Sequence, residues 1–218
     1  MNRNYDAVFF DFDGTVADTS RGIFNSADYA AIAFGLPVPD EAGHRYFMGP
    51  PLLESFDVVM GLKGEDGVEA VKKYREYYRA GGMLEMEFYP GMIDFLKKLQ
   101  LGGVRTAVTS SKPEMFVSQI LEHFEIADLF NLIACPRSDS LPEKKASLIT
   151  RALEHFEIAP SRALMVGDRY LDMQGAKQTG VDGCGAGWGY GTREELLDSG
   201  AKYIASSVPE LDRIVFGI

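Results

Sequence analysis

The chain has 218 residues, enough for one full hydrophobic core with room for an inserted subdomain. Its 32 acidic and 22 basic residues give a formal net charge of −10, which argues against nucleic-acid polymers and anionic membrane surfaces as partners. No apolar run approaches the roughly 20 residues of a membrane-spanning helix, and residues 1–4 lead into no signal-peptide core, so we expect a soluble, cytoplasmic protein.

The first predicted element is a buried strand over residues 7–10, a short apolar run that stops at two carboxylates. Side chains two positions apart point the same way in a strand, so Asp11 and Asp13 can reach one small volume. Gly14 permits a sharp turn there, and the hydroxyl of Thr15 can bond the local backbone. Two anions placed together need a cation or a shared proton, which favours a divalent metal beside a carboxylate nucleophile. The alternative interpretation is a solvated acidic turn.

A long interval without a convincing strand follows, from residue 16 to about residue 88. It contains several helix-like segments, one of them with apolar residues at Phe24, Ala27 and Ala31, and it is punctuated by prolines and glycines. About 70 residues are too many for an ordinary crossover between two strands. We therefore predict a helical cap domain over residues 16–88, inserted into a core domain formed by residues 1–15 and 89–218.

Short apolar runs alternate with helical periodicity in the rest of the chain. The remaining strands are predicted over residues 105–108, 132–135, 163–166 and 183–186. This alternation favours an α/β fold with a doubly wound, Rossmann-like parallel sheet, right-handed crossovers and helices on both faces. Ligands of such sheets bind beyond the carboxyl ends of the strands. Cys135 and Cys184 lie in two of the apolar runs and are expected to be reduced core residues.

Groups suited to bind a phosphate occur at two further places. Thr109 and Ser110 follow the second predicted strand, where their hydroxyl groups and the free amides of a helix N-terminus can donate to an anion. Capping of that helix is the alternative use of the same side chains. Lys144 and Lys145 precede a helical segment, where a cation opposes the helix dipole, so one of them is a candidate to neutralise a transferred phosphoryl group. A solvated lysine pair is the alternative.

Two more carboxylates, Asp168 and Asp172, follow the strand predicted at residues 163–166. Their spacing can place both on one side of a turn that enters a helix, and with Asp11 and Asp13 they would form an oxygen-rich cluster. Hard oxygen ligands suit Mg²⁺, which usually coordinates substrate phosphate as well. Each acid also has a plain structural explanation, as an N-cap or as an exposed helix carboxylate.

Taken together, the motifs resemble those of the haloacid dehalogenase-like hydrolase superfamily over essentially the whole chain. The matching segments are Asp11-Phe12-Asp13-Gly14-Thr15, Thr109-Ser110, Lys145 and residues 167–172, in the order of the first to the fourth motif. Residues 45–52 and 188–191 are similar to the phosphoglycolate phosphatase-like branch, especially its 5′-nucleotidases. Many relatives carry Lys-Pro at the third motif, whereas this chain has Glu-Lys-Lys-Ala at residues 143–146. That departure leaves the choice of lysine open, and we prefer Lys145 because it directly precedes the apolar helical pattern.

The resemblance implies a role for each catalytic and substrate-binding residue. Asp11 would attack phosphorus and form an aspartyl-phosphate, and Asp13 would protonate the leaving alcohol and then help to activate water. Lys145 would hold the nucleophile and the phosphate together. The phosphate itself would be bound by Gly14, Thr109 and Ser110.

The resemblance also implies a metal site and a specificity site. Mg²⁺ would be bound by the Asp11 carboxylate, the Asp13 carbonyl and Asp168. Asp172 would act through water or orient these ligands. The cap would select the substrate, with Arg45 as a candidate contact to the leaving group because it precedes a Gly-Pro-Pro turn. A solvated surface arginine is the alternative for Arg45.

We therefore expect a Mg²⁺-dependent phosphatase that hydrolyses a small phosphomonoester, such as phosphoglycolate or a related metabolite, as a monomer or homodimer. A 5′-nucleotidase is the alternative. Asp13 disfavours a haloalkanoate dehalogenase, because a departing halide needs no acid. Ile23 stands where similar phosphosugar mutases have a histidine, and no catalytic histidine is expected. The hypothesis from another class is a binding protein that has lost catalysis on the same fold.

Overall fold

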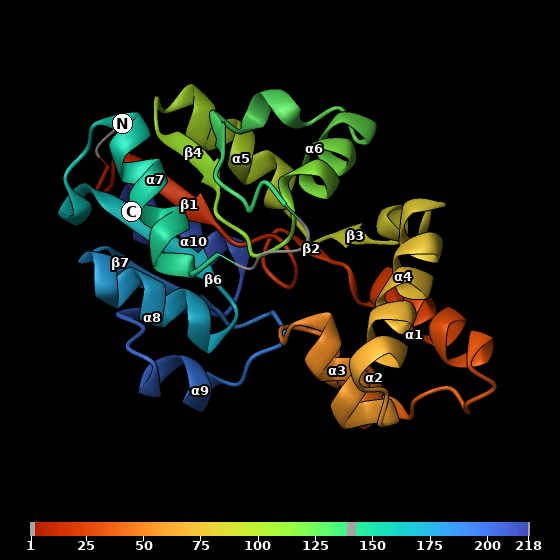
Figure 1. Cartoon of the computed structure of the whole chain (residues 1–218). Coiled ribbons are helices and arrows are strands. Elements are labelled where there is room, and N and C mark those ends of the chain that lie inside the picture. Colours follow the sequence, from red (N-terminus) through yellow and green to blue (C-terminus); the bar gives the residue numbers. More distant parts are fainter. Residues whose placement is uncertain (1–2, 139–142, 218) are drawn as a thin grey trace. The chain divides into compact units, whose positions relative to one another are not determined.

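The chain forms two compact units in the computed structural model, which describes residues 3–138 and 143–217 (Figure 1). The core unit holds the described residues up to Asp18 and from Phe88 onward, and the inserted unit is Thr19–Glu87. The chain therefore passes from one unit to the other twice, once after Asp18 and once before Phe88.

A six-stranded sheet with the order β5-β4-β1-β6-β7-β8 forms the centre of the core unit. Its strands are β1 (Ala7–Phe10), β4 (Arg105–Val108), β5 (Leu132–Ile133), β6 (Ala163–Gly167), β7 (Asp182–Ala186) and β8 (Tyr203–Ala205). Every neighbouring pair is parallel. All four residues of β1 are buried, as expected for a central strand of a parallel sheet that is covered on both faces.

Helices cover both faces of this sheet. They are α5 (Met92–Leu101), α6 (Glu114–His123), α7 (Lys145–Phe156), α8 (Tyr170–Thr179), α9 (Arg193–Asp198) and α10 (Val208–Phe216), with short 3₁₀ turns η2 (Ala127–Leu129) and η3 (Pro160–Arg162). Phe9 of β1 stacks on Phe156 of α7, with ring centroids 6.1 Å apart. Phe10 points to the opposite face, where Phe95 of α5 and Phe130 meet it edge-on. The predicted doubly wound α/β fold is confirmed.

The inserted unit is helical and has an apolar core of its own. Its elements are α1 (Ser20–Ala33), α2 (Glu41–Tyr46), α3 (Leu52–Met60), α4 (Gly64–Arg79) and η1 (Gly82–Leu84). Helices α1 and α4 pack against each other, and the rings of Phe47, Phe56, Tyr74 and Tyr78 form a contiguous aromatic cluster.

Three features differ from the sequence-based expectation. The interval from residue 16 to 88 was expected to lack strands, which is wrong at its two ends: β2 (Ala17–Asp18) and β3 (Glu87–Phe88) form a separate two-stranded sheet. Strand β5 ends at Ile133, and the edge strand β8 was not predicted. Two-residue strands are too short to show alternation, and a half-buried edge strand has no continuous apolar run.

Both cysteines are free and buried, as predicted. Burial raises the pKa of the Cys135 and Cys184 thiols to about 12, so both stay protonated and unreactive at neutral pH. None of the described helices has both the length and the apolar character needed to cross a bilayer.

Glu157 ends α7 in the left-handed conformation, with φ 53° and ψ 46°. An L side chain is disfavoured there by about 1–2 kcal/mol, and the greater freedom of glycine in the unfolded chain offsets about 0.4–1 kcal/mol of any gain. We expect Glu157→Gly to raise the free energy of unfolding by about 0.5–1 kcal/mol in urea denaturation. The matched control is Glu154→Gly on the exposed side of α7, which should lower it by about 1 kcal/mol. Similar losses for both variants would contradict the prediction.

Candidate active site

The candidate site lies at the carboxyl edge of the sheet, where three central strands end side by side. Phe10, the last residue of β1, is in register with Val108 of β4 and Val166 of β6. Polar residues follow each of these strands, Asp11 after β1 and Asp168 after β6. Because the strands are parallel and aligned, these polar side chains face one common volume.

Three carboxylates form an acidic triad in that volume. Asp11, Asp168 and Asp172 each offer an oxygen, and these oxygens lie within 4.8 Å of one another. Asp168 and Asp172 are fully buried. Both oxygens of Asp168 accept hydrogen bonds, one from the Thr15 hydroxyl at 3.1 Å and one from the main-chain N–H of Tyr190 at 2.9 Å.

The triad holds more negative charge than its surroundings favour. Burial, and then the charges of Asp11 and Asp172, raise the pKa of Asp168 well above the ordinary carboxyl value. Burial likewise raises the pKa of Asp172 to about 6, although the nearby Lys145 ammonium lowers it in part. The arrangement is therefore suited to receive a cation.

Lys145 is the cation that the chain itself places beside the triad. Its buried Nζ lies 3.1 Å from Asp11 Oδ1 and 2.7 Å from Asp172 Oδ1, and it donates to the Thr109 carbonyl at 2.9 Å. Burial lowers the pKa of Lys145, but the two carboxylates together raise it by more than burial lowers it. The net shift is upward, and the ammonium stays charged. Lys144, the other candidate for the third motif, is exposed at the N-cap of α7.

Sequence reasoning missed Lys112. Its buried ammonium pairs with Asp13 Oδ1 and lies 5.5 Å from the centre of the Phe12 ring. The Asp13 carboxylate is thus engaged with Lys112, outside the triad formed by the other three acids. Lys112 was overlooked because it stands between Ser111 and Pro113, in a stretch whose hydroxyl groups were interpreted as phosphate donors, with helix capping as the alternative.

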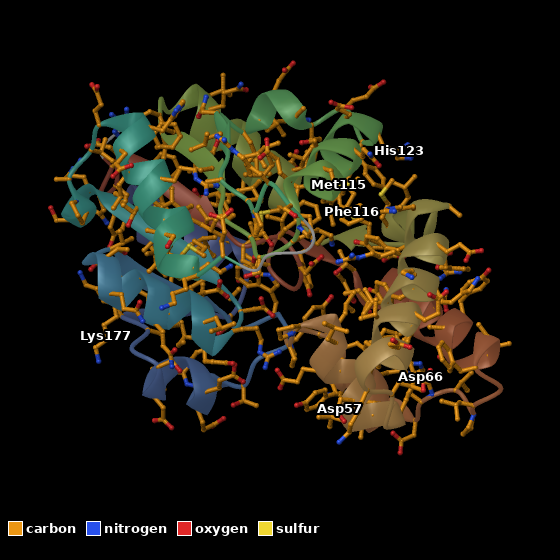
Figure 2. All side chains as sticks on the ribbon, viewed as in Figure 1. Asp57, Asp66, Met115, Phe116, His123 and Lys177 are labelled. Atoms are coloured by element: carbon orange, nitrogen blue, oxygen red, sulfur yellow. The ribbon has the colours of Figure 1, made fainter. Side chains whose placement is uncertain are left out.

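Charges at some other helix ends match the helix dipole, whereas the two site lysines oppose it. Figure 2 labels Asp66, in the first turn of α4, and His123 and Lys177, in the last turns of α6 and α8. An acid near the N-terminus and bases near the C-terminus match the partial charges of a helix. Lys145 instead begins α7, and Lys112 lies two residues before α6. Helix stability does not explain the position of either lysine, and this signal was available in the sequence for both.

Thr109 and Ser110 lie at the site but are engaged locally. The buried Thr109 hydroxyl lies 3.2 Å from Met165 Sδ and 3.5 Å from the Phe10 carbonyl, both as acceptors. Ser110 Oγ accepts the N–H of Lys112 at 3.2 Å. Helix α6 begins after Pro113 without a side-chain cap, so the alternative of simple N-capping by these two hydroxyls is wrong.

Glycines allow the chain to pack tightly around Asp168. Gly14 has φ +79°, and a Cβ there would lie 2.2 Å from Asp168 Oδ2. A Cβ at Gly189 would lie 2.3 Å from Asp168 Cβ, and one at Gly191 would lie 2.0 Å from the Asp168 carbonyl oxygen. Only glycine permits these approaches, and sequence reasoning assigned Gly189 and Gly191 no part in the site.

Arg45, the proposed leaving-group contact, belongs to the inserted unit. It lies on α2, its side chain is 69% exposed, and it forms an ion pair with Glu41 at 2.8 Å. Such an exposed pair contributes little to stability.

Comparison with known proteins places this geometry in context. The family model described as haloacid dehalogenase-like hydrolase matches residues 8–186, a range that includes all four motifs. The chain is 36% identical to tyrosine-protein kinase PtkA from Mycobacterium tuberculosis over 207 residues, which are 95% of this chain and 70% of that protein. It is 35% identical to a 5′-nucleotidase from Pseudomonas aeruginosa over 192 residues, which are 88% of this chain and 87% of that protein.

One further relative and one solved structure agree with the family match. The chain is 31% identical to a phosphoglycolate phosphatase from Vibrio vulnificus, with 95% of both chains covered. A haloacid dehalogenase-like hydrolase from Streptococcus pneumoniae has the same fold, with a TM-score of 0.87 and 36% identity over 95% of this chain and 97% of that one. These findings confirm the resemblance that the four motifs predicted, and they support a phosphoric monoester hydrolase.

The crowding of carboxylates predicts that the native chain without divalent cations is stabilised by losing one charge. We expect Asp168→Asn to raise the free energy of unfolding in EDTA by about 1–3 kcal/mol at pH 7. The Asn oxygen can still accept the Tyr190 N–H, and the Thr15 hydroxyl can rotate to accept from the amide. Denaturant titrations at several pH values provide the measurement.

The pH dependence of this stability difference shows whether the Asp168 charge causes it. Because the pKa of Asp168 is raised in the folded state, the wild type loses stability as pH rises above the ordinary carboxyl value, and the gap to Asp168→Asn should close toward pH 4. The control is Asp182→Asn. Burial raises the pKa of Asp182, but hydrogen bonds from Lys202 and Tyr5 together lower it by more, so its net shift is downward. The Asp182 charge therefore stabilises the fold, and this variant should be destabilised at pH 7. A loss of stability in Asp168→Asn that is independent of pH would contradict the prediction.

Proposed function

The chain belongs to the haloacid dehalogenase-like hydrolase family, and on this premise we propose that it is a Mg²⁺-dependent phosphatase that hydrolyses a small phosphomonoester through an aspartyl-phosphate on Asp11. The observation that carries the proposal is the position of the Lys145 ammonium between Asp11 and Asp172, beside the buried Asp168. A carboxylate nucleophile, a fixed cation and an oxygen-rich triad are the parts that phosphoryl transfer requires.

The donor set of the triad fits a small, hard divalent cation. Three carboxylate oxygens within 4.8 Å carry more negative charge than one lysine neutralises, and carboxylate oxygens are the ligands that Mg²⁺ prefers. Asp11 and Asp168 would hold the ion together with the Asp13 carbonyl. Asp172, which is already paired with Lys145, would act through water or orient the ligands. When bound, Mg²⁺ would neutralise the charge of the phosphoryl oxygens.

The residues of the chain divide the remaining chemistry. An Asp11 oxygen attacks phosphorus while the leaving alkoxide takes a proton from Asp13. Asp13 then accepts a proton from water, the water oxygen attacks phosphorus, and the bond to Asp11 breaks to release phosphate. Lys145 holds the Asp11 carboxylate in place and neutralises the phosphoryl group from one side. Main-chain and hydroxyl groups of Gly14, Thr109 and Ser110 are the proposed phosphate contacts.

The proposed substrate is phosphoglycolate or a similarly small phosphate ester, and the alternative is a nucleoside 5′-monophosphate. The full-length similarity to a phosphoglycolate phosphatase supports the first, and the similarity to a 5′-nucleotidase supports the second. The core motifs bind only phosphate and metal, so we propose that the inserted unit is a cap that selects the leaving group, with Arg45 as one contact. We further propose that the enzyme acts on metabolites in the cytoplasm.

A phosphate-release assay tests the proposal. The wild type should hydrolyse phosphoglycolate, or failing that a nucleoside monophosphate, only when Mg²⁺ is added. Asp11→Asn should lower kcat by at least about 10⁴-fold, because an amide is a poor nucleophile. Asp198→Asn, at the exposed end of α9, is the matched control and should keep wild-type activity. Substantial turnover by Asp11→Asn would remove Asp11 as nucleophile, and transfer of labelled phosphate from ATP to tyrosine without ester hydrolysis would favour the kinase activity that PtkA is named for.

The role of Asp13 as general acid predicts a dependence on the leaving group. Asp13→Asn should slow hydrolysis of an alkyl phosphate by about 10²–10⁴-fold. It should slow p-nitrophenyl phosphate much less, since p-nitrophenolate leaves without a proton. The ratio of kcat/KM values for the two esters is the measurement. An equal loss on both esters would show that Asp13 serves the geometry of the site instead of proton transfer.

A further inference from the structure

The segment that follows β7 contacts both the acidic triad and the point where the chain leaves the core unit. We propose that Tyr190 is a positioning residue that fastens this first crossing, at Asp18, to Asp168. The inference deepens the proposed function and rests on it in one respect, since it takes Asp168 as a residue of the active site.

Tyr190 makes one hydrogen bond to each end of this connection. Its main-chain N–H donates to Asp168 Oδ2 at 2.9 Å, and its phenolic hydroxyl donates to Asp18 Oδ1, also at 2.9 Å. Asp18 ends β2 and is the last residue of the core unit before the inserted unit begins. One residue thus holds a buried carboxylate of the triad by its backbone and the crossing by its side chain.

A second chain of hydrogen bonds links the segment after β7 to Asp168 through Thr15. The indole N–H of Trp188 donates to the Thr15 carbonyl at 3.1 Å, and the Thr15 hydroxyl donates to Asp168 Oδ1 at 3.1 Å. The loop that contains Thr15 is closed by a hydrogen bond from the Gly14 N–H to the Ala17 carbonyl at 2.9 Å. Both oxygens of Asp168 are therefore bonded to groups that also fix the stretch leading to Asp18.

Steric contact makes this connection stiff. The backbone at Gly189 and Gly191 lies so close to Asp168 that a Cβ at either position would overlap it, at 2.3 Å and 2.0 Å. Since these two glycines flank Tyr190, the tyrosine backbone has little room to move without Asp168. A shift of either end should therefore be felt at the other.

The return crossing contacts the same segment. The ring of Tyr89 lies 6.2 Å from that of Trp188, and the Tyr89 N–H donates to the Val16 carbonyl at 3.3 Å. Phe88 packs edge-on against Phe124, with ring centroids 5.1 Å apart. The two crossings, which pair through β2 and β3, are thus both anchored beside residues 188–190.

Coupling of this kind is reciprocal. If the position of Asp18 affects Asp168, then whatever orders Asp168 must also order the crossing. The Tyr190 hydroxyl is the group to remove, because Tyr190→Phe keeps the ring and the main-chain bond to Asp168 while it frees Asp18 from this donor.

Hydrogen exchange of the full chain, read by mass spectrometry in EDTA, is the first test. In Tyr190→Phe the amides of Ala17, Asp18 and Tyr89 should exchange about 5-fold faster, as expected for loss of one net hydrogen bond. The matched control is Tyr5→Phe, which loses a 2.7 Å hydrogen bond to Asp182 at the amino edge of the same sheet. It should leave exchange at the crossings unchanged. Unchanged exchange at the crossings in Tyr190→Phe, or an equal increase over the whole sheet, would overturn the proposal.

The second test uses Mg²⁺ alone, with binding followed by calorimetry. The ion should slow exchange at Ala17 and Asp18 in the wild type and in Tyr5→Phe, but not in Tyr190→Phe. Binding of Mg²⁺ with equal protection in all three proteins, or with no protection in the wild type, would overturn the coupling. Absence of Mg²⁺ binding to the wild type would instead contradict the proposed function, and the exchange measured in EDTA would still decide whether Tyr190 fastens the crossing.

Discussion

The crowding of three carboxylates at the end of a buried sheet is the constraint on which the rest of the site depends. Oxygens of Asp11, Asp168 and Asp172 lie within 4.8 Å of one another, and burial of Asp168 and Asp172 removes the water that would otherwise stabilise their charges. One ammonium, that of Lys145, stands against three acids. The protein therefore keeps an excess of negative charge at the site, and this excess opposes folding while it favours a bound cation.

The sheet tolerates this arrangement because the rest of its centre is apolar and tightly packed. Strand β1 sends Phe9 to one helical layer and Phe10 to the other, so its alternation is hidden in a continuous apolar run. The register that aligns Phe10 with Val108 and Val166 brings the polar residues after three strands to one edge. Packing of the core and convergence of the site are thus two results of the same strand order.

The parts of this structure that could be predicted from the sequence are those with a local signal. Fully buried strands such as β1 and β6 show as short apolar runs. Acids that directly follow them, such as Asp11 and Asp168, could be assigned to one edge because the strands were predicted to be parallel. Lys112 had the same unfavourable position at a helix start as Lys145, but the stretch around it was interpreted only through its hydroxyl groups. The contacts of Tyr190 had no local signal, because they join residues 22 and 172 positions apart in the chain. Only the tertiary approach permitted by Gly189 and Gly191 creates them.

The separation of the two apolar cores has a consequence for how specificity can change in this family. The inserted unit has its own aromatic cluster, which includes Phe56 and Tyr74, so substitutions there need not disturb the packing beneath the triad. Relatives with 31–36% identity over most of this chain are named as a kinase, a nucleotidase and a phosphatase. Similar sequences are thus named for different activities, and the fold alone does not fix the function. The two crossings are the covalent connections between the units; the first is hydrogen-bonded to Tyr190, and the second contacts Trp188 through the Tyr89 ring. A change within the inserted unit that alters either crossing therefore has a short mechanical route to the carboxylates of the triad.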